Sequence, residues 1–237
     1  PVPASGGDFT HRAVVDDFRP RHAAIPQKVV HPHLTRGQIH VVPGRAPPLR
    51  LEPRAERQRG NAHGRTGGFL GGARAQEEVL CRSSALYLTL QDDPMYEQHR
   101  KRPRPDSTSW AIYSPDVPVF RKDDGSEIDS PWPLSFLTCA TPLARAIGQP
   151  ESGDLLQDRI HRVLDIARAY GHTSLVLGAW GCGAFANDPS RTAADFRHAM
   201  ENDFNGAFSN VVFAITDWSP ERKFLGPFRD TFITDDD

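Results

Sequence analysis

The sequence predicts an α/β domain whose helices cover both faces of a sheet. Three segments, 134–139, 173–178 and 211–215, are short apolar runs without polar alternation, as in strands that are buried on both faces. Helical patterns with one apolar stripe lie between these segments. Because predicted strands and amphipathic helices alternate along the chain, we expect a three-layer α/β domain.

The remaining elements follow from periodicity and from turn residues. An apolar stripe predicts one helix over about 73–91, and a polar linker near Lys101–Asp106 follows it. The extended or turn segments expected next are 110–114, 117–120 and Asp123-Asp124-Gly125. Two further helices are predicted, over 153–170 with a stop at Gly171, and over about 189–202.

Composition and cysteine usage narrow the class of protein. No run of about eighteen apolar residues occurs, and the first residues lack the charged and then apolar pattern of a secretory signal. Cys81, Cys139 and Cys182 are far apart and form no Cys-x-x-Cys pair, which argues against a disulfide framework and a zinc site. His31-Pro32-His33 is interpreted as a solvated loop pair. We therefore expect a soluble, cytoplasmic, monomeric protein that needs no metal and no cofactor.

Residues 1–66 differ in composition from the rest of the chain. They hold eleven Lys and Arg against five Asp and Glu, nine of the 21 prolines and six of the ten histidines, but only two aromatic residues. Such a segment has little with which to build a core. At most one strand is credible in it, at a short cluster such as Val29-Val30 or Ile39-His40-Val41-Val42. We divide the chain into this basic segment, which is a tail or a corrupted start of the domain, and a folded domain over 67–237.

Two glycine-rich loops precede predicted helices. The first, Gly67–Gly72, introduces a helix whose opening turns carry Gln76-Glu77-Glu78. A carboxylate pair is favoured at any helix N-terminus by the helix dipole, so the pair alone can be purely structural. The glycines change that weighting, because they let a substrate backbone or sugar lie against the loop, within reach of a carboxylate on the helix behind it.

The second loop, Gly178-Ala179-Trp180-Gly181-Cys182-Gly183-Ala184-Phe185, joins a predicted strand to a predicted helix. Backbone N–H groups in such a loop suit a phosphate or diphosphate, but a tight turn explains the same residues on spacing alone. The loop matches neither a Walker motif nor a dinucleotide fingerprint. Cys182 is interpreted as a small buried thiol, because no partner base is identifiable, and Trp180 as a packing residue rather than a stacking platform.

Together the two loops resemble those of a known family. Gly67-Gly68 followed by Gln76-Glu77-Glu78 is similar to the Gly-Gly-Gly and Gln-Glu-Glu pattern of poly(ADP-ribose) glycohydrolases. The segments that resemble the bacterial-type branch are 82–87, 112–121 and 177–189. Since four separated segments agree in order, the resemblance covers about residues 67–217.

This resemblance implies a fold, a substrate and roles for the site residues. The fold is a macrodomain-like α/β/α sandwich with a mixed sheet, which binds ADP-ribose in a cleft at the strand ends. Glu78 matches the catalytic acid/base, and Glu77 matches the neighbour that holds ribose hydroxyls. Gly178 through Ala184 match the diphosphate-binding loop, and Phe185 matches an aromatic residue near the distal ribose. The other residues expected to bind substrate are Asn61, Gly67, Gly68, Phe69 and Gln76.

The reaction that the resemblance implies is hydrolysis of the ribose–ribose O-glycosidic bonds of poly(ADP-ribose), with release of ADP-ribose. An oxocarbenium-like transition state needs a proton for the leaving oxygen and a base for the incoming water. One glutamate can supply both in sequence at the same face, without a metal. The expected partners are poly(ADP-ribose) or ADP-ribosylated proteins, and neither a membrane nor a sequence-specific nucleic acid.

The chain departs from the family pattern just before the first loop. Thr66 stands where the family has its first glycine, and a β-branched residue would strain a position that needs a positive φ. Asn61-Ala62 still resembles the pair before the glycines, but no strand is recognisable in 54–60. One hypothesis is that residues 1–65 are partly the out-of-frame translation of a GC-rich gene. The alternative is a divergent or disordered tail that contacts the anionic polymer.

Three other functions stay open. A non-catalytic ADP-ribose reader would have the same fold; the altered glycine triplet favours it, and the retained Gln76-Glu77-Glu78 argues against it. A mono(ADP-ribose) hydrolase or another nucleotide-sugar hydrolase would use the same cleft. Nucleic-acid binding through the basic segment rests on charge alone.

Overall fold

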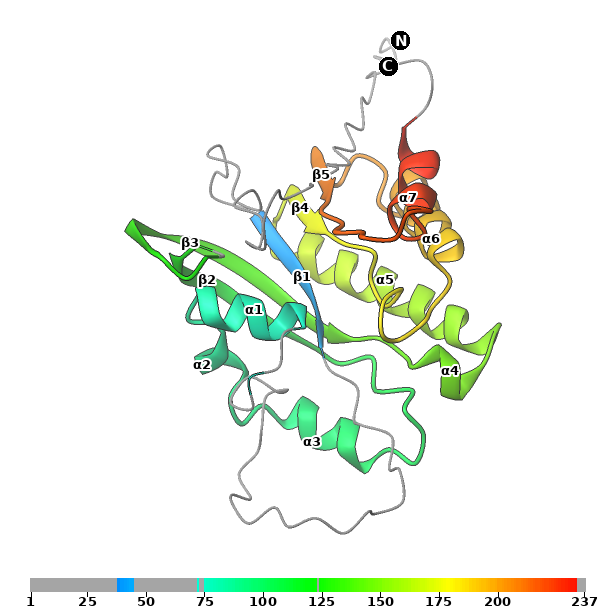
Figure 1. The fold of residues 1–237 in the computed structure, drawn as a ribbon, viewed down its shortest axis with the longest axis horizontal. Helices are drawn as coiled ribbons and strands as arrows, with labels where there is room; N and C mark the ends of the chain where they lie inside the picture. Colours follow the sequence, from blue (N-terminus) through cyan, green and yellow to red (C-terminus); the bar gives the residue numbers. More distant parts are fainter. Residues whose placement is uncertain (1–37, 45–71, 73–74, 123, 234–237) are drawn as a thin grey trace, which may run out of the picture.

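The computed structural model describes residues 38–44, 72, 75–122 and 124–233, which form a mixed α/β fold around one five-stranded sheet (Figure 1). The strands are β1 Gln38–Gly44, β2 Ala111–Arg121, β3 Glu127–Ala140, β4 Ser174–Leu177 and β5 Asn210–Phe213. The helices are α1 Gln76–Ser83, α2 Leu86–Leu90, α3 Pro94–Lys101, α4 Ala144–Ile147, α5 Glu151–Ala169, α6 Pro189–Glu201 and α7 Leu225–Phe232. None of the described helices is both long enough and apolar enough to cross a membrane.

The sheet has the strand order β2-β3-β1-β4-β5, with β1 at its centre. β2 and β3 are antiparallel, whereas β3, β1, β4 and β5 run parallel to one another. In register, Ile39 of β1 lies between Ser135 of β3 and Leu175 of β4. The sequence analysis allowed at most one strand in residues 1–66, and the apolar cluster 39–42 lies in such a strand, β1. The division of the chain at residue 66 stays a prediction, but a strand from upstream of it belongs to this sheet.

Most of the predicted elements are confirmed. The three buried-strand candidates lie in β3, β4 and β5, and the extended segments 110–114 and 117–120 join into β2 with a register shift between Ser114 and Val117. The two later helices are α5 and α6, and Gly171 follows α5 with a φ of 75°. Helices α3, α4 and α7 were not predicted.

The prediction of one helix over 73–91 is wrong, because this region forms two helices. Ser84 ends α1 in an extended conformation with φ −146° and pairs with Val119 at the edge of β2. Ala85 N–H then donates to the carbonyl of Pro118 at 3.0 Å. The Ser84 hydroxyl donates to the carbonyl of Leu80 at 2.7 Å, so it also satisfies a carbonyl of the last turn. Pairing with β2 therefore interrupts a segment whose apolar spacing is continuous.

The core consists of two apolar clusters on opposite faces of β3. Successive strand residues point to opposite faces, and the buried neighbours Phe136 and Leu137 accordingly join different clusters. Phe136 packs with residues of α1, α2 and α3, while Leu137 packs with residues of α5, α6 and α7. Helices therefore cover β3 on both sides, as the apolar runs without alternation predicted.

A buried polar cluster joins the end of α3 to α5. The guanidinium of Arg159 is almost fully buried and donates to the carbonyls of Ala140 at 3.1 Å, Ser107 at 3.3 Å and Asp106. His99 contacts the hydroxyl of Thr108 through Nε2 at 2.8 Å. Burial, together with the positive charge of Arg159, lowers the pKa of His99 from 6.5 to about 4. The folded protein thus favours the neutral imidazole.

The free energy of unfolding is expected to fall as the pH drops from about 6.5 toward 4. In this range His99 is protonated in the unfolded chain, whereas in the folded chain it stays neutral until about pH 4. One such group contributes a slope of at most about 1.4 kcal/mol per pH unit. Urea unfolding of the wild type and of His99→Gln at several pH values in this window measures the difference. An equal slope in both proteins would contradict the assignment.

Candidate functional site

The described residues of the predicted site lie at the edge of the sheet where the parallel strands end. The loops after β3 and β4 meet there, since Asn187 Nδ2 donates to the carbonyl of Pro142 at 2.9 Å. Helix α1 packs against β1 and begins on the side where β1 ends (Figure 1). The first turn of α1 and the glycine loop after β4 are therefore on the same edge of the sheet.

Two buried carboxylates stand in the first turn of α1. Ala75 precedes the helix in an extended conformation, and its carbonyl accepts the N–H of Val79 at 3.0 Å, which closes the first turn. Gln76 is exposed, whereas Glu77 and Glu78 are only 2% and 1% exposed. The positive end of the helix dipole stabilises negative charge at this position. The helix thereby holds two acids out of bulk water.

Tyr96 of α3 contacts the first of these acids. Its hydroxyl donates to Oε2 of Glu77 at 3.1 Å, and both side chains are buried. Burial, with the charge and the hydrogen bond of Glu77, raises the pKa of Tyr96 above its usual range, so the phenol stays protonated and remains a donor. Cys81 lies one turn along α1, and burial followed by the charges of Glu77 and Glu78 raises the pKa of its thiol to about 12.

The glycine loop after β4 is built from successive tight turns. Trp180 N–H donates to the Gly178 carbonyl at 2.8 Å, and Cys182 N–H to the Ala179 carbonyl at 3.1 Å. Gly181 has a φ of 77°, which favours glycine. The loop is therefore a series of tight turns, and this structure is also compatible with binding of an anion by its backbone.

The exposed part of this loop presents backbone donors. Gly183 and Ala184 are exposed, and within the described part of the chain their N–H groups donate to no acceptor. Phe185, which is half-buried, fixes the far end of the loop because its carbonyl accepts the N–H of Ala144 at 2.9 Å. Free amides on a strand-to-helix loop are suited to a phosphate group.

The loop side chains of Trp180 and Cys182 point into the core, as predicted. Trp180 is 4% exposed, and its ring centroid lies 6.5 Å from that of Phe196 in α6. Cys182 is 3% exposed, and burial raises the pKa of its thiol to about 11. These two residues can therefore contribute to the loop surface through their backbone, and Cys182 is unsuited to act as a nucleophile.

Several predicted residues lie outside the described part of the chain. They are His31, His33, Asn61, Thr66, Gly67, Gly68 and Phe69. Gly72 is described; it is exposed and has a φ of 77°. Among the described residues, no group of three His, Cys, Asp or Glu side chains is placed to hold a metal ion.

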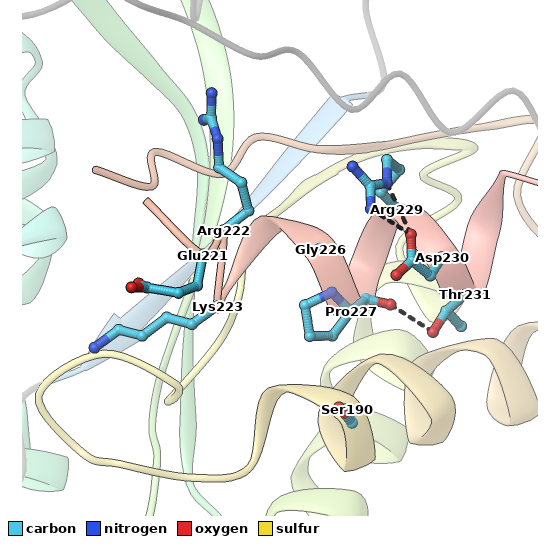
Figure 2. A pocket seen from close by; sticks show the side chains of 9 residues that line it. All are labelled: Ser190, Glu221, Arg222, Lys223, Gly226, Pro227, Arg229, Asp230 and Thr231. Atoms are coloured by element: carbon cyan, nitrogen blue, oxygen red, sulfur yellow. Dashed lines mark hydrogen bonds and ion pairs between the residues drawn. The ribbon is translucent and has the colours of Figure 1, made fainter. Parts of the chain in front are cut away.

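A pocket of about 580 Å³ lies beside α7 and the start of α6 (Figure 2). It is lined by Ser190 at the start of α6 and by residues between 221 and 231. Figure 2 shows the side chains of Glu221 and Lys223 extending to the same side, that of Arg222 extending upward, and Arg229 paired with its neighbour Asp230. No predicted site residue lines this pocket, so its shape gives no support to the site.

Two residues of the site were missed in the sequence. Tyr96 reaches Glu77 across nineteen positions, and Asn187 reaches Pro142 across 45. Tyr96 is part of an unpredicted helix, and Asn187 lies just before α6, for which the sequence predicted only a helix over about 189–202. No local signal in the sequence identifies either contact, because both depend on the tertiary fold.

Comparison with known proteins places the chain in a family. The family described as microbial-type PARG, catalytic domain, matches residues 60–122. Poly(ADP-ribose) glycohydrolase (PARG) from Deinococcus radiodurans, solved in complex with ADP-ribose, is 36% identical with a TM-score of 0.70, and the match covers 83% of this chain and 75% of that chain. PARG from Thermomonospora curvata, bound to the inhibitor ADP-HPD, is 38% identical with a TM-score of 0.71, over 84% and 72%. No curated protein sequence matches.

Both structural matches exceed 30% identity and cover more than two thirds of this chain and of each relative. The chain belongs to the bacterial-type poly(ADP-ribose) glycohydrolase family. The resemblance drawn from the glycine loops and from Gln76-Glu77-Glu78 is confirmed.

Cys182 is expected to resist alkylation in the folded protein, because its thiol is buried and has a pKa of about 11. Its reaction with iodoacetamide at pH 8 should be about a hundredfold slower than that of the same cysteine after unfolding in urea. Mass spectrometry of the tryptic peptide measures both rates. Rapid labelling of the native protein would show an accessible, activated thiol and would reopen a nucleophilic role.

Proposed function

We propose that this chain hydrolyses the ribose–ribose O-glycosidic bonds of poly(ADP-ribose) and releases ADP-ribose. The observation that carries the proposal is the buried pair Glu77-Glu78 at the start of α1, in a chain that belongs to this glycohydrolase family. Relatives at 36% and 38% identity were solved with ADP-ribose and with the inhibitor ADP-HPD. The exposed amides of the loop after β4 supply a second element of such a site.

In this proposal Glu78 is the general acid and base. It protonates the oxygen of the leaving ribose as the glycosidic bond breaks, and an oxocarbenium-like sugar forms. The resulting carboxylate then takes a proton from water as that water adds to the anomeric carbon, which restores Glu78. The N-terminal position on α1 stabilises the carboxylate between the two steps. Burial excludes competing solvent.

Glu77 and the loop after β4 position the substrate. Glu77, with Oε2 hydrogen-bonded to Tyr96, accepts hydrogen bonds from ribose hydroxyls. The amides near Gly183 and Ala184 bind the diphosphate, and Phe185 packs near the distal ribose. Asn61, Gly67, Gly68 and Phe69 complete the proposed contacts.

The family also supports proposals about architecture and partners. We infer a three-layer α/β/α macrodomain sandwich, because helices contact both faces of β3 and the relatives share this fold. The domain extends upstream at least to β1, since β1 pairs with both β3 and β4. The proposed substrates are poly(ADP-ribose) or ADP-ribosylated proteins. We also propose that the protein is a monomer. The cytoplasmic location is retained as a prediction.

Glu78→Gln is expected to lower the release of ADP-ribose from labelled poly(ADP-ribose) by about 10²–10⁴-fold, since the amide cannot exchange a proton. The change is nearly isosteric, so binding of ADP-ribose should persist. Glu97→Gln is the matched control, because Glu97 is an exposed carboxylate on α3 that pairs with Lys101. Equal activity of Glu78→Gln and wild type would remove Glu78 from its role.

The same assay separates the other functions when a singly ADP-ribosylated protein is added as a second substrate. Release from the polymer supports the proposal. Release from the single modification alone would identify a mono(ADP-ribose) hydrolase, and binding without release would identify a reader.

Tyr96→Phe should lower kcat/KM about five- to tenfold, because Glu77 loses one buried hydrogen bond while the ring still fills its place. Tyr170→Phe serves as the control, since the Tyr170 ring is 61% exposed and stacks on Tyr113. Steady-state kinetics of both variants measure the effect. Wild-type kinetics in Tyr96→Phe would show that the hydroxyl does not position Glu77 for the reaction.

A further inference from the structure

We infer that Asn187 is the positioning residue that holds the loop after β4 in its ligand-binding shape, an inference that rests on the proposed function. Asn187 is 2% exposed and lies between the loop and helix α6. It is therefore too deep to act as a surface contact. Its effect on substrate comes through the backbone of the loop.

Every hydrogen-bonding group of the Asn187 side chain has a partner. Nδ2 donates to the carbonyl of Pro142 at 2.9 Å and to that of Gly181 at 3.1 Å. Oδ1 accepts the hydroxyl of Ser152 at 2.6 Å. The backbone N–H of Asn187 also donates to the Gly181 carbonyl, at 3.0 Å. One residue thereby joins the loop to the segment after β3 and to the first turn of α5.

The carbonyls of Pro142 and Gly181 determine which way the amide of Asn187 faces, because a carbonyl oxygen can only accept a hydrogen bond. The NH₂ group therefore points toward these two carbonyls, and the buried Ser152 hydroxyl, which can donate or accept, donates to Oδ1. A reversed amide would place its oxygen against the Pro142 and Gly181 carbonyls, which is repulsive. The first turn of α5 thus supplies the hydrogen bond that satisfies the remaining group of the amide.

Gly181 is shaped to accept this contact. A Cβ at Gly181 would lie 2.8 Å from Asn187 Nδ2 and 3.2 Å from the Thr141 side chain, and its φ of 77° already favours glycine. The amide of Asn187 therefore occupies the space that a side chain at 181 would take. This close packing leaves no room for a side chain at position 181 and restricts the backbone there.

The span that carries the free amides is held at both ends. Asn187 fixes the Gly181 carbonyl at one end, and Ala144 N–H fixes the Phe185 carbonyl at the other. Gly183 and Ala184 lie between these two points and are exposed. Preorganised donors bind an anion without first losing backbone freedom. Asn187 should therefore affect binding of the diphosphate, while Glu78 on α1 is left in place.

The test compares Asn187→Ala, Ser152→Ala and wild type in full-length protein. Asn187→Ala should weaken ADP-ribose binding, measured by calorimetry, by about tenfold and raise KM for poly(ADP-ribose) similarly, with kcat within about twofold of wild type. Ser152→Ala should change the same quantities in the same direction but less. Asn202→Ala is the matched control, since Asn202 is exposed at the end of α6.

Hydrogen exchange of the loop amides supplies a readout that needs no ligand. The hydrogen-bonded loop amides, those of Trp180, Cys182 and Ala186, should exchange faster in Asn187→Ala and in Ser152→Ala, with α1 unchanged. If Asn187→Ala does not fold, Ser152→Ala provides the test, because this variant keeps Asn187 and removes only the hydrogen bond to its Oδ1. Wild-type affinity and loop exchange in the folded variants would overturn the inference. A wild type that neither binds nor cleaves would instead refute the proposed function, and loop exchange would still decide the role of Asn187.

Discussion

The pairing of β1 with both β3 and β4 is the constraint on which the site depends. Among the described strands, β2 and β3 form one antiparallel pair and β4 and β5 form one parallel pair. Only β1 joins these two pairs, through six register positions with β3 and three with β4. Because all three strands run in the same direction, their carboxyl ends meet at one edge. The loops that follow β3 and β4 contact each other as a result.

The two halves of the proposed site rest on different parts of the core. Glu77 and Glu78 belong to α1, whose buried Cys81 joins the cluster formed with α2 and α3. Trp180 and Cys182 of the glycine loop join the cluster formed with α5, α6 and α7. In each half a buried polar side chain completes the arrangement, Tyr96 in the first and Asn187 in the second. Such groups are costly to bury unless they are hydrogen-bonded, so each of these two side chains favours the arrangement in which its bonds are made.

The elements that sequence periodicity identified are those whose apolar pattern and boundary residues are local in the sequence. Helix α6 begins at an Asp-Pro pair whose Asp188 carboxylate accepts the Ser190 N–H, and Gly171 follows α5. The break at Ser84 was hidden because it depends on pairing with β2, which lies 35 residues further along the chain. The contacts of Tyr96 with Glu77 and of Asn187 with Pro142 could not be predicted for the same reason. The family motifs identified the carboxylates and the loop, whereas the residues that hold them depend on contacts that only the folded chain makes.

The interruption at Ser84 has a mechanical consequence for the proposed acid/base. Helix α1 is clamped to β2 at Ser84 and Ala85, and Glu78 stands near its opposite end. At about 1.5 Å per residue, the turn that carries Glu78 is roughly 9 Å from the clamp. A tilt of about 10° there would sweep the carboxylate by about 1.5 Å, and a misplacement of that order costs about a hundredfold in rate. The pairing of Ser84 and Ala85 with β2 therefore restricts the tilt of α1, and with it the position of the carboxylate that we propose as the acid and base.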